Sequence, residues 1–93
     1  MSAYVLIHGT PKNAEKMQEY SAAAGSIVGK FGGELLVRGA ADVLCGEHSH
    51  KIVVLMKFPD AETAHKWYDS AEYQALIPIR EEGIESTFIL CGE

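Results

Sequence analysis

The sequence predicts an α+β fold of the ferredoxin-like plan, with the element order strand–helix–strand–strand–helix–strand and one antiparallel sheet. Two segments repeat apolar residues at every third or fourth position, and four other segments are short, β-rich and apolar. Glycines and prolines fall between these segments, where turns are needed. The 93 residues provide one domain over residues 1–93, and a chain this short gains stability from a partner subunit.

The first half of the chain begins with a strand followed by a helix. Residues 3–8 are apolar on both faces, which is typical of a strand that is covered on both sides. Thr10 is the expected N-cap of the helix, and Pro11 is expected at its first position. The backbone N–H that proline lacks has no partner within the helix at that position. Gly32 and Gly33 are expected to end the helix. Its apolar stripe comprises Ala14, Met17, Ser21, Ala24, Ile27 or Val28, and Phe31.

The middle of the chain predicts a hairpin. Residues 34–39 and 42–45 form the second extended segment, and a bulge is expected at residues 39–41 between its two parts. Residues 46–49 form the turn, and residues 50–58 form the longest strand.

The last part of the chain predicts helical pieces and a final strand. Asp60 is the expected N-cap of a helix that ends near Asp69, and Ser70 caps a further helical piece. Pro78 is expected to break or kink that piece because proline removes a helical hydrogen bond. Residues 85–91 form the last strand.

Composition excludes several classes of function. The formal net charge is −5 and the eight basic residues are scattered, so we expect no nucleic-acid partner and no anionic membrane. No signal peptide and no membrane span are visible, and Cys45 and Cys91 belong to no metal-binding spacing. We therefore expect a cytoplasmic protein with free thiols. No phosphate loop, dinucleotide motif or catalytic triad is present, and no cofactor is expected.

Strand alternation divides the sheet residues into two sets, both of them apolar. The set expected beneath the chain's own helices is Val5, Ile7, Leu35, Val37, Ile52, Val54, Met56, Phe58, Ile89 and Cys91. The set expected on the second face is Tyr4, Leu6, His8, Glu34, Leu36, Arg38, Val53, Leu55, Phe88 and Leu90. An exposed apolar face of this size predicts an interface, so we expect a homodimer that encloses a chamber containing His8, Glu34 and Arg38.

Trp67, Tyr68, Ser70, Glu72 and Tyr73 form a dense cluster of aromatic and polar residues. Further positions that belong to the same pattern are residues 58–61, Ala64, Asp69, residues 74–76, Arg80, Gly32, Gly33, Arg38, Gly39 and Gly46. Together these residues resemble the bacterial domain-of-unknown-function family 1330 (DUF1330) over nearly the whole chain. Family members often have an acidic residue where this chain has Cys45.

The resemblance implies membership of the dimeric α+β barrel superfamily. It implies a ferredoxin-like fold, a homodimer and a barrel cavity. The superfamily spans cofactor-independent oxygenases, lactone isomerases and haem-handling enzymes, so this likeness does not select a reaction.

Arg38 and His8 are the candidate catalytic residues. A guanidinium in an apolar chamber can bind a carboxylate through two hydrogen bonds, or can pair structurally with Glu34 or a helix carboxylate. His8 lies at the end of the first strand, where it can act as a general base or remain a solvated histidine.

Aromatic residues and a second arginine complete the candidate substrate-binding set. Trp67 and Tyr68 cannot share one helix face, so one is expected to pack on the sheet while the other leans toward the next helical piece. Trp67, Tyr68 and Tyr73 can line the cavity or serve as core. Arg80 can hold an anion, or pair with Glu72 or with an acid of a partner chain.

His48 and His50 alternate on an extended segment and therefore point the same way. Two histidines without a visible third ligand are a weak signal, so no metal site is predicted.

Two hypotheses follow from these observations. The first is a small-molecule-binding barrel, with cofactor-independent catalysis on a small carboxylate or carbonyl compound as its enzymatic form. The alternative is a non-catalytic binding or assembly module whose cavity is filled by its own side chains. Cavity volume discriminates between them, because ligand sites enclose roughly 300 Å³ or more.

Overall fold

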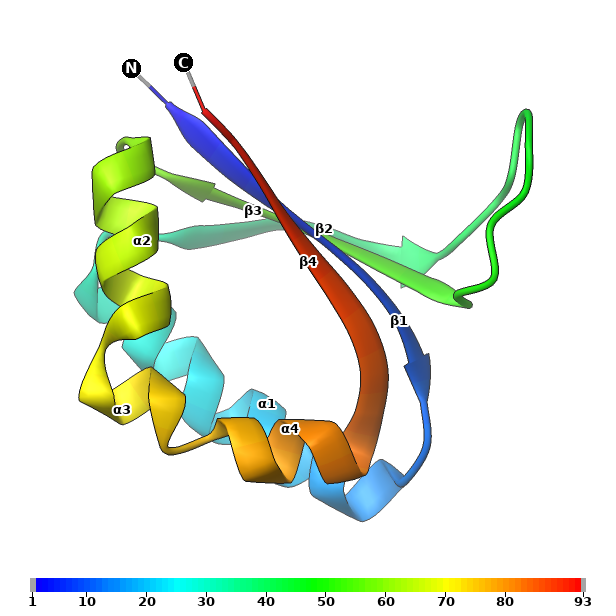
Figure 1. Ribbon diagram of the computed structural model, residues 1–93, viewed down its shortest axis with the longest axis horizontal. Helices are drawn as coiled ribbons and strands as arrows, with labels where there is room; N and C mark the ends of the chain where they lie inside the picture. Colours follow the sequence, from blue (N-terminus) through cyan, green and yellow to red (C-terminus); the bar gives the residue numbers. More distant parts are fainter. Residues whose placement is uncertain (1, 93) are drawn as a thin grey trace.

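The computed structural model describes residues 2–92 and contains a four-stranded antiparallel sheet with its helices on one face (Figure 1). The strands lie in the order β2-β3-β1-β4, which confirms the ferredoxin-like fold. The elements are β1 (Ala3–Pro11), α1 (Ala14–Lys30), β2 (Glu34–Ala40), β3 (Ile52–Phe58), α2 (Ala61–Asp69), α3 (Ala71–Gln74), α4 (Ile77–Gly83) and β4 (Ile84–Gly92).

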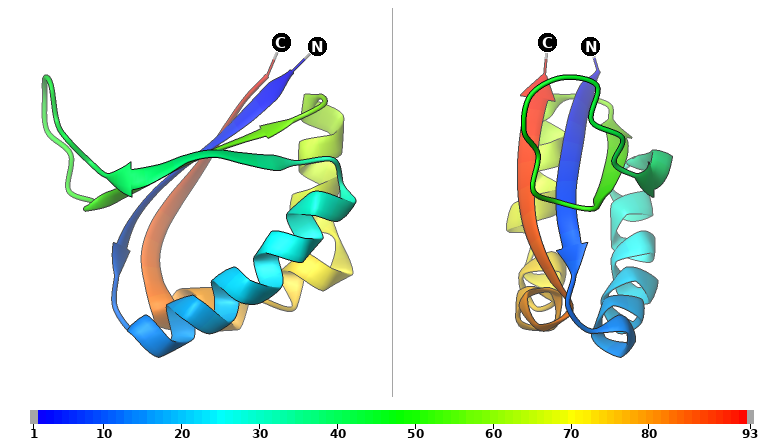
Figure 2. Two further views of the ribbon diagram at one scale, coloured as in Figure 1. Left: turned by 180° about the vertical axis from the view of Figure 1, so that it is seen from behind. Right: turned by 90° about the vertical axis from the view of Figure 1, so that its right-hand side faces the viewer.

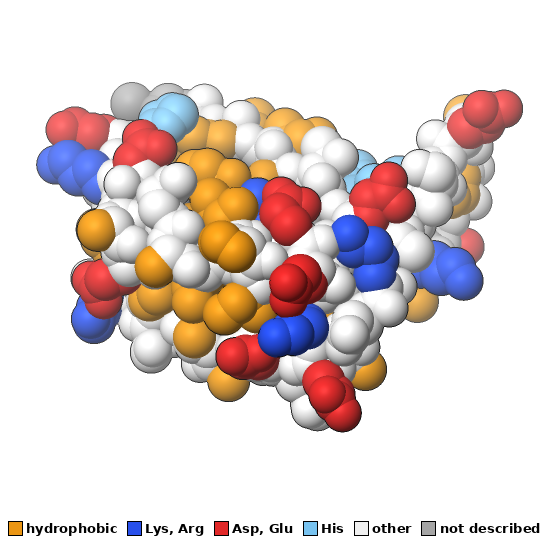
Figure 3. Space-filling view, turned by 60° about the horizontal axis from the view of Figure 1, so that its bottom comes forward, with side chains coloured by type: hydrophobic (Ala, Val, Ile, Leu, Met, Phe, Trp, Pro, Cys, Tyr) orange, Lys and Arg blue, Asp and Glu red, His pale blue; other side chains and the backbone are white. Residues whose placement is uncertain are grey.

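The sheet is strongly curved, and its two faces have different surroundings. The helices lie inside the curve of β1 and β4, while the opposite face carries no helix (Figure 2). Residues 41–51 connect β2 to β3 as a long loop that projects away from the body of the molecule, and we call this loop the arm. Around the helices, acidic and basic side chains are interspersed about a band of hydrophobic ones (Figure 3).

The start of α1 differs from the prediction. Its N-cap is Asn13, whose side chain accepts a hydrogen bond from the backbone N–H of Lys16, so the prediction of Thr10 was wrong. The physical reason is that β4 is long enough to pair with Thr10 and Pro11, which keeps both residues in β1. The prediction at the other end was correct, since Gly32 follows the helix with a positive φ of 73°.

The hairpin also differs in detail. The bulge interrupts pairing between Leu35 and Val37, instead of residues 39–41, and residues 42–45 belong to the arm instead of a strand. The extra residue is Leu36, which has no partner on β3.

The bulge moves Arg38 to the other face of the sheet. Arg38 pairs with Val54, and Val37 pairs with Leu55, so Arg38 points to the helix side and Val37 to the helix-free side. Both assignments reverse the prediction.

Strand β4 is also reversed between faces. Leu90 pairs with Val5 and Phe88 pairs with Ile7, so Phe88 and Leu90 pack under the helices while Ile89 lies on the helix-free face with Cys91. Alternation alone could not assign this strand because both of its residue sets are apolar.

The second half of the chain follows its predicted caps. The Asp60 side chain accepts a hydrogen bond from the Thr63 N–H, and the Ser70 hydroxyl accepts one from Tyr73 N–H. Pro78 lies in the first turn of α4, where it needs no helical partner. Of the two predicted outcomes, the break is therefore the one observed, since α3 ends at Gln74 and a new helix begins at Ile77.

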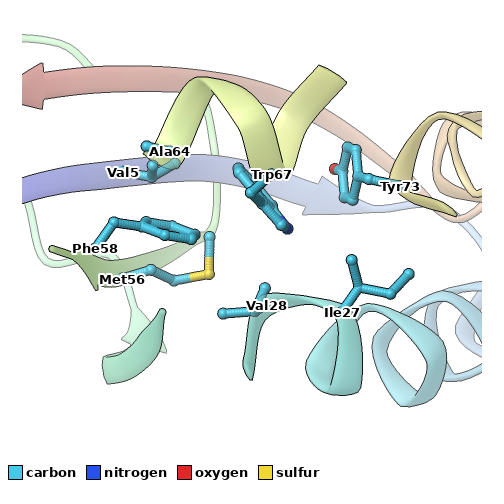
Figure 4. Close-up of a cluster of buried hydrophobic side chains, with 8 residues drawn as sticks. All are labelled: Val5, Ile27, Val28, Met56, Phe58, Ala64, Trp67 and Tyr73. Carbon is cyan, nitrogen blue, oxygen red and sulfur yellow. The ribbon is translucent and has the colours of Figure 1, made fainter. Parts of the chain in front are cut away.

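The core lies between the helices and the sheet (Figure 4). Trp67, Tyr73 and Phe58 are its largest fully buried side chains, and the Trp67 ring lies between the other two, with centroid distances of 5.1 Å to Phe58 and 4.7 Å to Tyr73. Gly83 permits α4 to approach α1, since a Cβ there would lie 2.7 Å from the Met17 backbone nitrogen.

Several large apolar side chains remain exposed on the helix-free face and the arm. Tyr4, Val37 and Ile89 are 36%, 58% and 46% exposed on that face, and Leu44 on the arm is 95% exposed. Cys45 on the arm and Cys91 on β4 are free and exposed. Within residues 2–92, no helix is long and apolar enough to span a membrane.

Candidate functional site

A partly open apolar cavity of about 240 Å³ lies between α1 and the helix side of the sheet, and we call it the helix-side cavity. The sheet contributes aliphatic side chains from β1 and β3, including Ile7, Val54 and Met56. Trp67 of α2 and Phe88 of β4 contribute aromatic surface. The chamber predicted on the other face needs a partner subunit and stays a prediction, so this cavity is a different space, within one chain.

The sequence of α1 explains why this space exists. Ser21, Ala24, Gly25 and Gly29 line the cavity and carry small side chains or none. A Cβ added at Gly25 or Gly29 would meet nothing within 4 Å. Glycine inside a helix lowers the stability of the protein by about 0.5–1 kcal/mol relative to alanine. No close neighbour among the described residues requires glycine at either position.

Arg38 lies at the exposed edge of the helix-side cavity. Its side chain forms no ion pair with any residue in the described range 2–92, so the pair considered with Glu34 is absent. Leu35, the preceding residue of β2 that points to the same side of the sheet, also lines the cavity and is 57% exposed. The edge therefore combines a free guanidinium with apolar surface.

Arg80 is buried behind the cavity, with 7% of its surface exposed. It donates hydrogen bonds to the hydroxyls of Tyr68 and Tyr73, at 3.1 and 3.0 Å, and to the Glu81 carboxylate at 3.0 Å. Burial lowers the pKa of Arg80, but these three hydrogen bonds more than offset that effect, so its pKa is raised. Arg80 is thus a permanent internal cation. The pairing considered with Glu72 is absent, because Glu72 binds Lys30 instead.

Tyr20, which was not among the residues expected from the sequence, connects this arginine to the cavity. Its hydroxyl lies 2.6 Å from that of Tyr73, and the residue lines the helix-side cavity. Burial, followed by the interaction with Tyr73, raises the pKa of Tyr20, which therefore stays protonated near neutral pH. Tyr20 lies three residues after Met17 and four before Ala24, on the apolar stripe of α1, and this position is the signal that could have identified it.

Trp67 is 2% exposed, and its indole nitrogen Nε1 has no hydrogen-bond partner among the described residues. The nitrogen end of the ring points toward α1, the helix that forms one wall of the helix-side cavity (Figure 4). Tyr68 leans away and lines a smaller hollow of about 170 Å³ between α2 and β4. The predicted division between Trp67 and Tyr68 is thus correct, and Trp67 is the one that packs on the sheet.

The structure separates the two candidate catalytic residues. His8 lies on the helix-free face, as predicted, but Arg38 lies on the other side of the sheet. His8 instead contacts His48 through Nδ1 and His48 Nε2, and His50 Nδ1 lies 3.1 Å from Thr10 Oγ1. Burial, His48 and His50 lower the pKa of His8. Within residues 2–92, no three His, Cys, Asp or Glu side chains are arranged to hold a metal ion.

The fold defines a class of ferredoxin-like α+β proteins with a cavity between sheet and helices. The chain belongs to the family described as a domain of unknown function, DUF1330, which matches residues 2–92. No functionally curated protein matches the chain.

Solved structures share the fold at low sequence identity. A protein of unknown function from Rhodopseudomonas palustris is 15% identical, with a TM-score of 0.82, over 99% of this chain and 82% of its own. SnoaB, a cofactor-independent oxygenase from Streptomyces nogalater, is 8% identical, with a TM-score of 0.72, over 99% of this chain and 92% of its own. A dimeric ferredoxin-like protein of unknown function from Thermobifida fusca is 11% identical, with a TM-score of 0.65, over 100% of this chain and 92% of its own.

Proposed function

We propose that this protein is a homodimer that binds a small molecule in the helix-side cavity of each subunit. As an enzyme, the protein would catalyse a cofactor-independent reaction on a small carboxylate or carbonyl compound. One observation carries the proposal: an apolar cavity of about 240 Å³ with the unpaired Arg38 guanidinium at its edge. Apolar walls with a few placed polar groups are the usual composition of a ligand site.

The volume limits the size of the ligand. Drug-sized pockets enclose about 300–1,000 Å³, whereas a cavity of about 150 Å³ in another protein holds benzene. At about 240 Å³ the helix-side cavity is smaller than the roughly 300 Å³ expected from the sequence for a ligand site, but larger than the cavity that holds benzene. A molecule with one ring and one or two substituents therefore fits best.

Arg38 supplies the preference for an anion in this proposal. Its planar guanidinium binds a carboxylate through two hydrogen bonds, and its exposure at the edge avoids the cost of burying a charge. His8 has no part in this site because it lies on the other face of the sheet.

The helix-free face supports the dimer. Its exposed side chains, together with Leu44 on the arm, form apolar surface that a second copy would remove from water. Ferredoxin-like proteins from Thermobifida fusca and Bacteroides fragilis with the same fold are described as dimeric. Cofactor-independent chemistry is supported by the likeness to SnoaB, which has that description.

The test combines native mass spectrometry of protein purified from its source with calorimetric titration of benzoate. Gly25→Leu places a side chain in the open space beside α1 and should abolish binding. Ala22→Leu makes the same kind of change at an exposed position outside the cavity and should leave binding intact. Absence of any retained ligand, together with no binding by a panel of small carboxylates and carbonyls, would favour a non-catalytic assembly module.

A further inference from the structure

We infer that a pair of neutral histidines fastens the arm to the helix-free face, and that acid releases it. The pair joins His8 of β1 to His48 in the returning half of the arm, residues 47–51, and we call it the histidine latch. The latch lies on the opposite side of the sheet from the helix-side cavity and does not depend on the proposed function. The arm is closed at neutral pH and opens below about pH 6, in the range where histidine changes its charge.

Two contacts between side chains attach the returning half of the arm to β1. His8 Nδ1 contacts His48 Nε2, and His50 Nδ1 lies 3.1 Å from Thr10 Oγ1. The backbone adds one hydrogen bond at the base of the arm, where the Lys51 N–H donates to a carbonyl of β1 at 3.0 Å. Among the described residues, the side chains that hold this half of the arm on the sheet are therefore mainly histidines.

The neutral form of the latch has a favourable place for each of its protons. A hydrogen bond between two imidazoles needs one ring nitrogen with a proton and one without. Two neutral rings carry two protons, one in the contact and one on an outer nitrogen, either His8 Nε2 or His48 Nδ1. His8 Nε2 is buried without a partner in the described chain, whereas His48 Nδ1 is not one of the buried unpartnered atoms. The neutral pair therefore keeps its outer proton on His48.

A further proton has no favourable place while the arm is closed. Both outer nitrogens of the pair then carry protons, so His8 Nε2 becomes a buried donor of a cation with no acceptor. If both rings are charged, the hydrogen bond itself is lost, because the two facing nitrogens both carry protons. Opening the arm gives the protonated rings access to water and removes both penalties.

The neighbours of His8 make its charged form still less favourable. The ring centroids of His48 and His50 lie 4.6 and 6.5 Å from that of His8, so these rings add like charge when they are protonated. On the adjacent strands, His8 pairs with two uncharged residues, Val53 of β3 and Thr87 of β4.

Charged side chains near the latch do not compensate a charged His8. Asp42, Glu47 and Lys51 belong to the arm, and Glu85 of β4 is two residues from Thr87 on the same face. No carboxylate of the described chain forms an ion pair with a histidine. Burial, followed by His48 and His50, lowers the pKa of His8, and this is the direction that the latch requires.

The test follows the Lys51 amide proton, which loses its bond to β1 when the returning half of the arm lifts. Its exchange with solvent is measured by NMR at about pH 7.5 and about pH 5.5, relative to the intrinsic rate at each pH. A metal chelator is present throughout. In the wild-type protein, the protection of this amide should be about tenfold lower at the acidic pH.

Three variants separate the latch from other effects of acid. His8→Asn keeps a neutral amide that can bond to His48 but cannot be charged, so the arm should stay closed at both pH values. His8→Ala removes the contact, so the arm should be open at both. His65→Gln is the matched control, because it removes an exposed histidine of α2 and should respond to acid as the wild-type protein does. Thermal melts show which variants fold, and if His8→Ala does not, the His8→Asn comparison decides.

A second measurement needs no substitution beyond those used for assignment. The chain has four histidines, and their ring ¹⁵N shifts report which nitrogens carry protons. His8 Nε2 should gain its proton at a lower pH than the nitrogens of His65 do.

Three results would overturn the latch. The first is equal protection of the Lys51 amide at both pH values in the wild-type protein. The second is a His8→Asn variant that opens in acid as the wild-type protein does, which would assign the switch to other groups. The third is a His8 ring that titrates together with His65.

Discussion

Replacing Arg80 with methionine should destabilise the chain severely, although Arg80 is outside the helix-side cavity. Methionine keeps most of the stem packing and removes the charge and the donors. The hydroxyls of Tyr68 and Tyr73 then lose their donor inside the core. Hydrogen bonds from a charged group contribute about 1.5–3 kcal/mol each, so the two together amount to about 3–6 kcal/mol.

The bond to Glu81 adds little, because that carboxylate is 59% exposed and such pairs contribute less than about 1 kcal/mol. Urea denaturation followed by circular dichroism measures the free energy of unfolding directly. Lys30→Met is the matched control, since it breaks the exposed ion pair with Glu72 and should cost less than about 1 kcal/mol. If the two variants differ by less than about 1 kcal/mol, Arg80 does not stabilise the core as its hydrogen bonds indicate.

Three further predictions concern the site, the surface and the histidines. Arg38→Met should change the free energy of unfolding by no more than about 1–2 kcal/mol and weaken benzoate binding by about tenfold, and an unchanged affinity by calorimetry would remove Arg38 from the site. Light scattering should give twice the monomer mass, and Ile89→Glu on the helix-free face should give monomers; a wild-type monomer would contradict the dimer. The pKa of His8 is lowered by burial and by His48 and His50, so the folded protein favours the neutral ring. The contribution of His8 to the free energy of unfolding is therefore complete above pH 6.5, the ordinary pKa of histidine, and decreases as the pH falls below that value. His8→Gln should flatten that fall between about pH 7.5 and 5.5 in urea titrations, and an equally steep fall in both proteins would assign it to other groups.

The fold was predictable because its local signals are strong. Asp60, Ser70 and Gly32 carry caps whose chemistry is specific to a helix end, and all three act as predicted. The start of α1 was less predictable, because Thr10 and Asn13 are both good N-caps. The choice between them depends on how far β4 extends, which is a long-range property.

The site was predictable only in part. Trp67 and Arg38 were among the candidates, and the structure places both at one cavity, while their roles stay predictions. The face of Arg38 and the role of Tyr20 were not predictable, because the first depends on the unpaired Leu36 and the second on a hydroxyl contact with Tyr73. The cavity itself results from side chains that are absent at Gly25 and Gly29, and an absence leaves little pattern in a sequence.

The bulge in β2 has a consequence for comparing this chain with its relatives. One unpaired residue, Leu36, decides whether Arg38 reaches the helix-side cavity or the helix-free face. A relative with the same Arg-Gly pair but no bulge would display its arginine on the helix-free face, which we propose as the dimer interface, and not at the helix-side cavity. Alignments of this family should therefore be anchored on strand pairing, since a single insertion or deletion between positions 35 and 37 can exchange an arginine between two unrelated tasks.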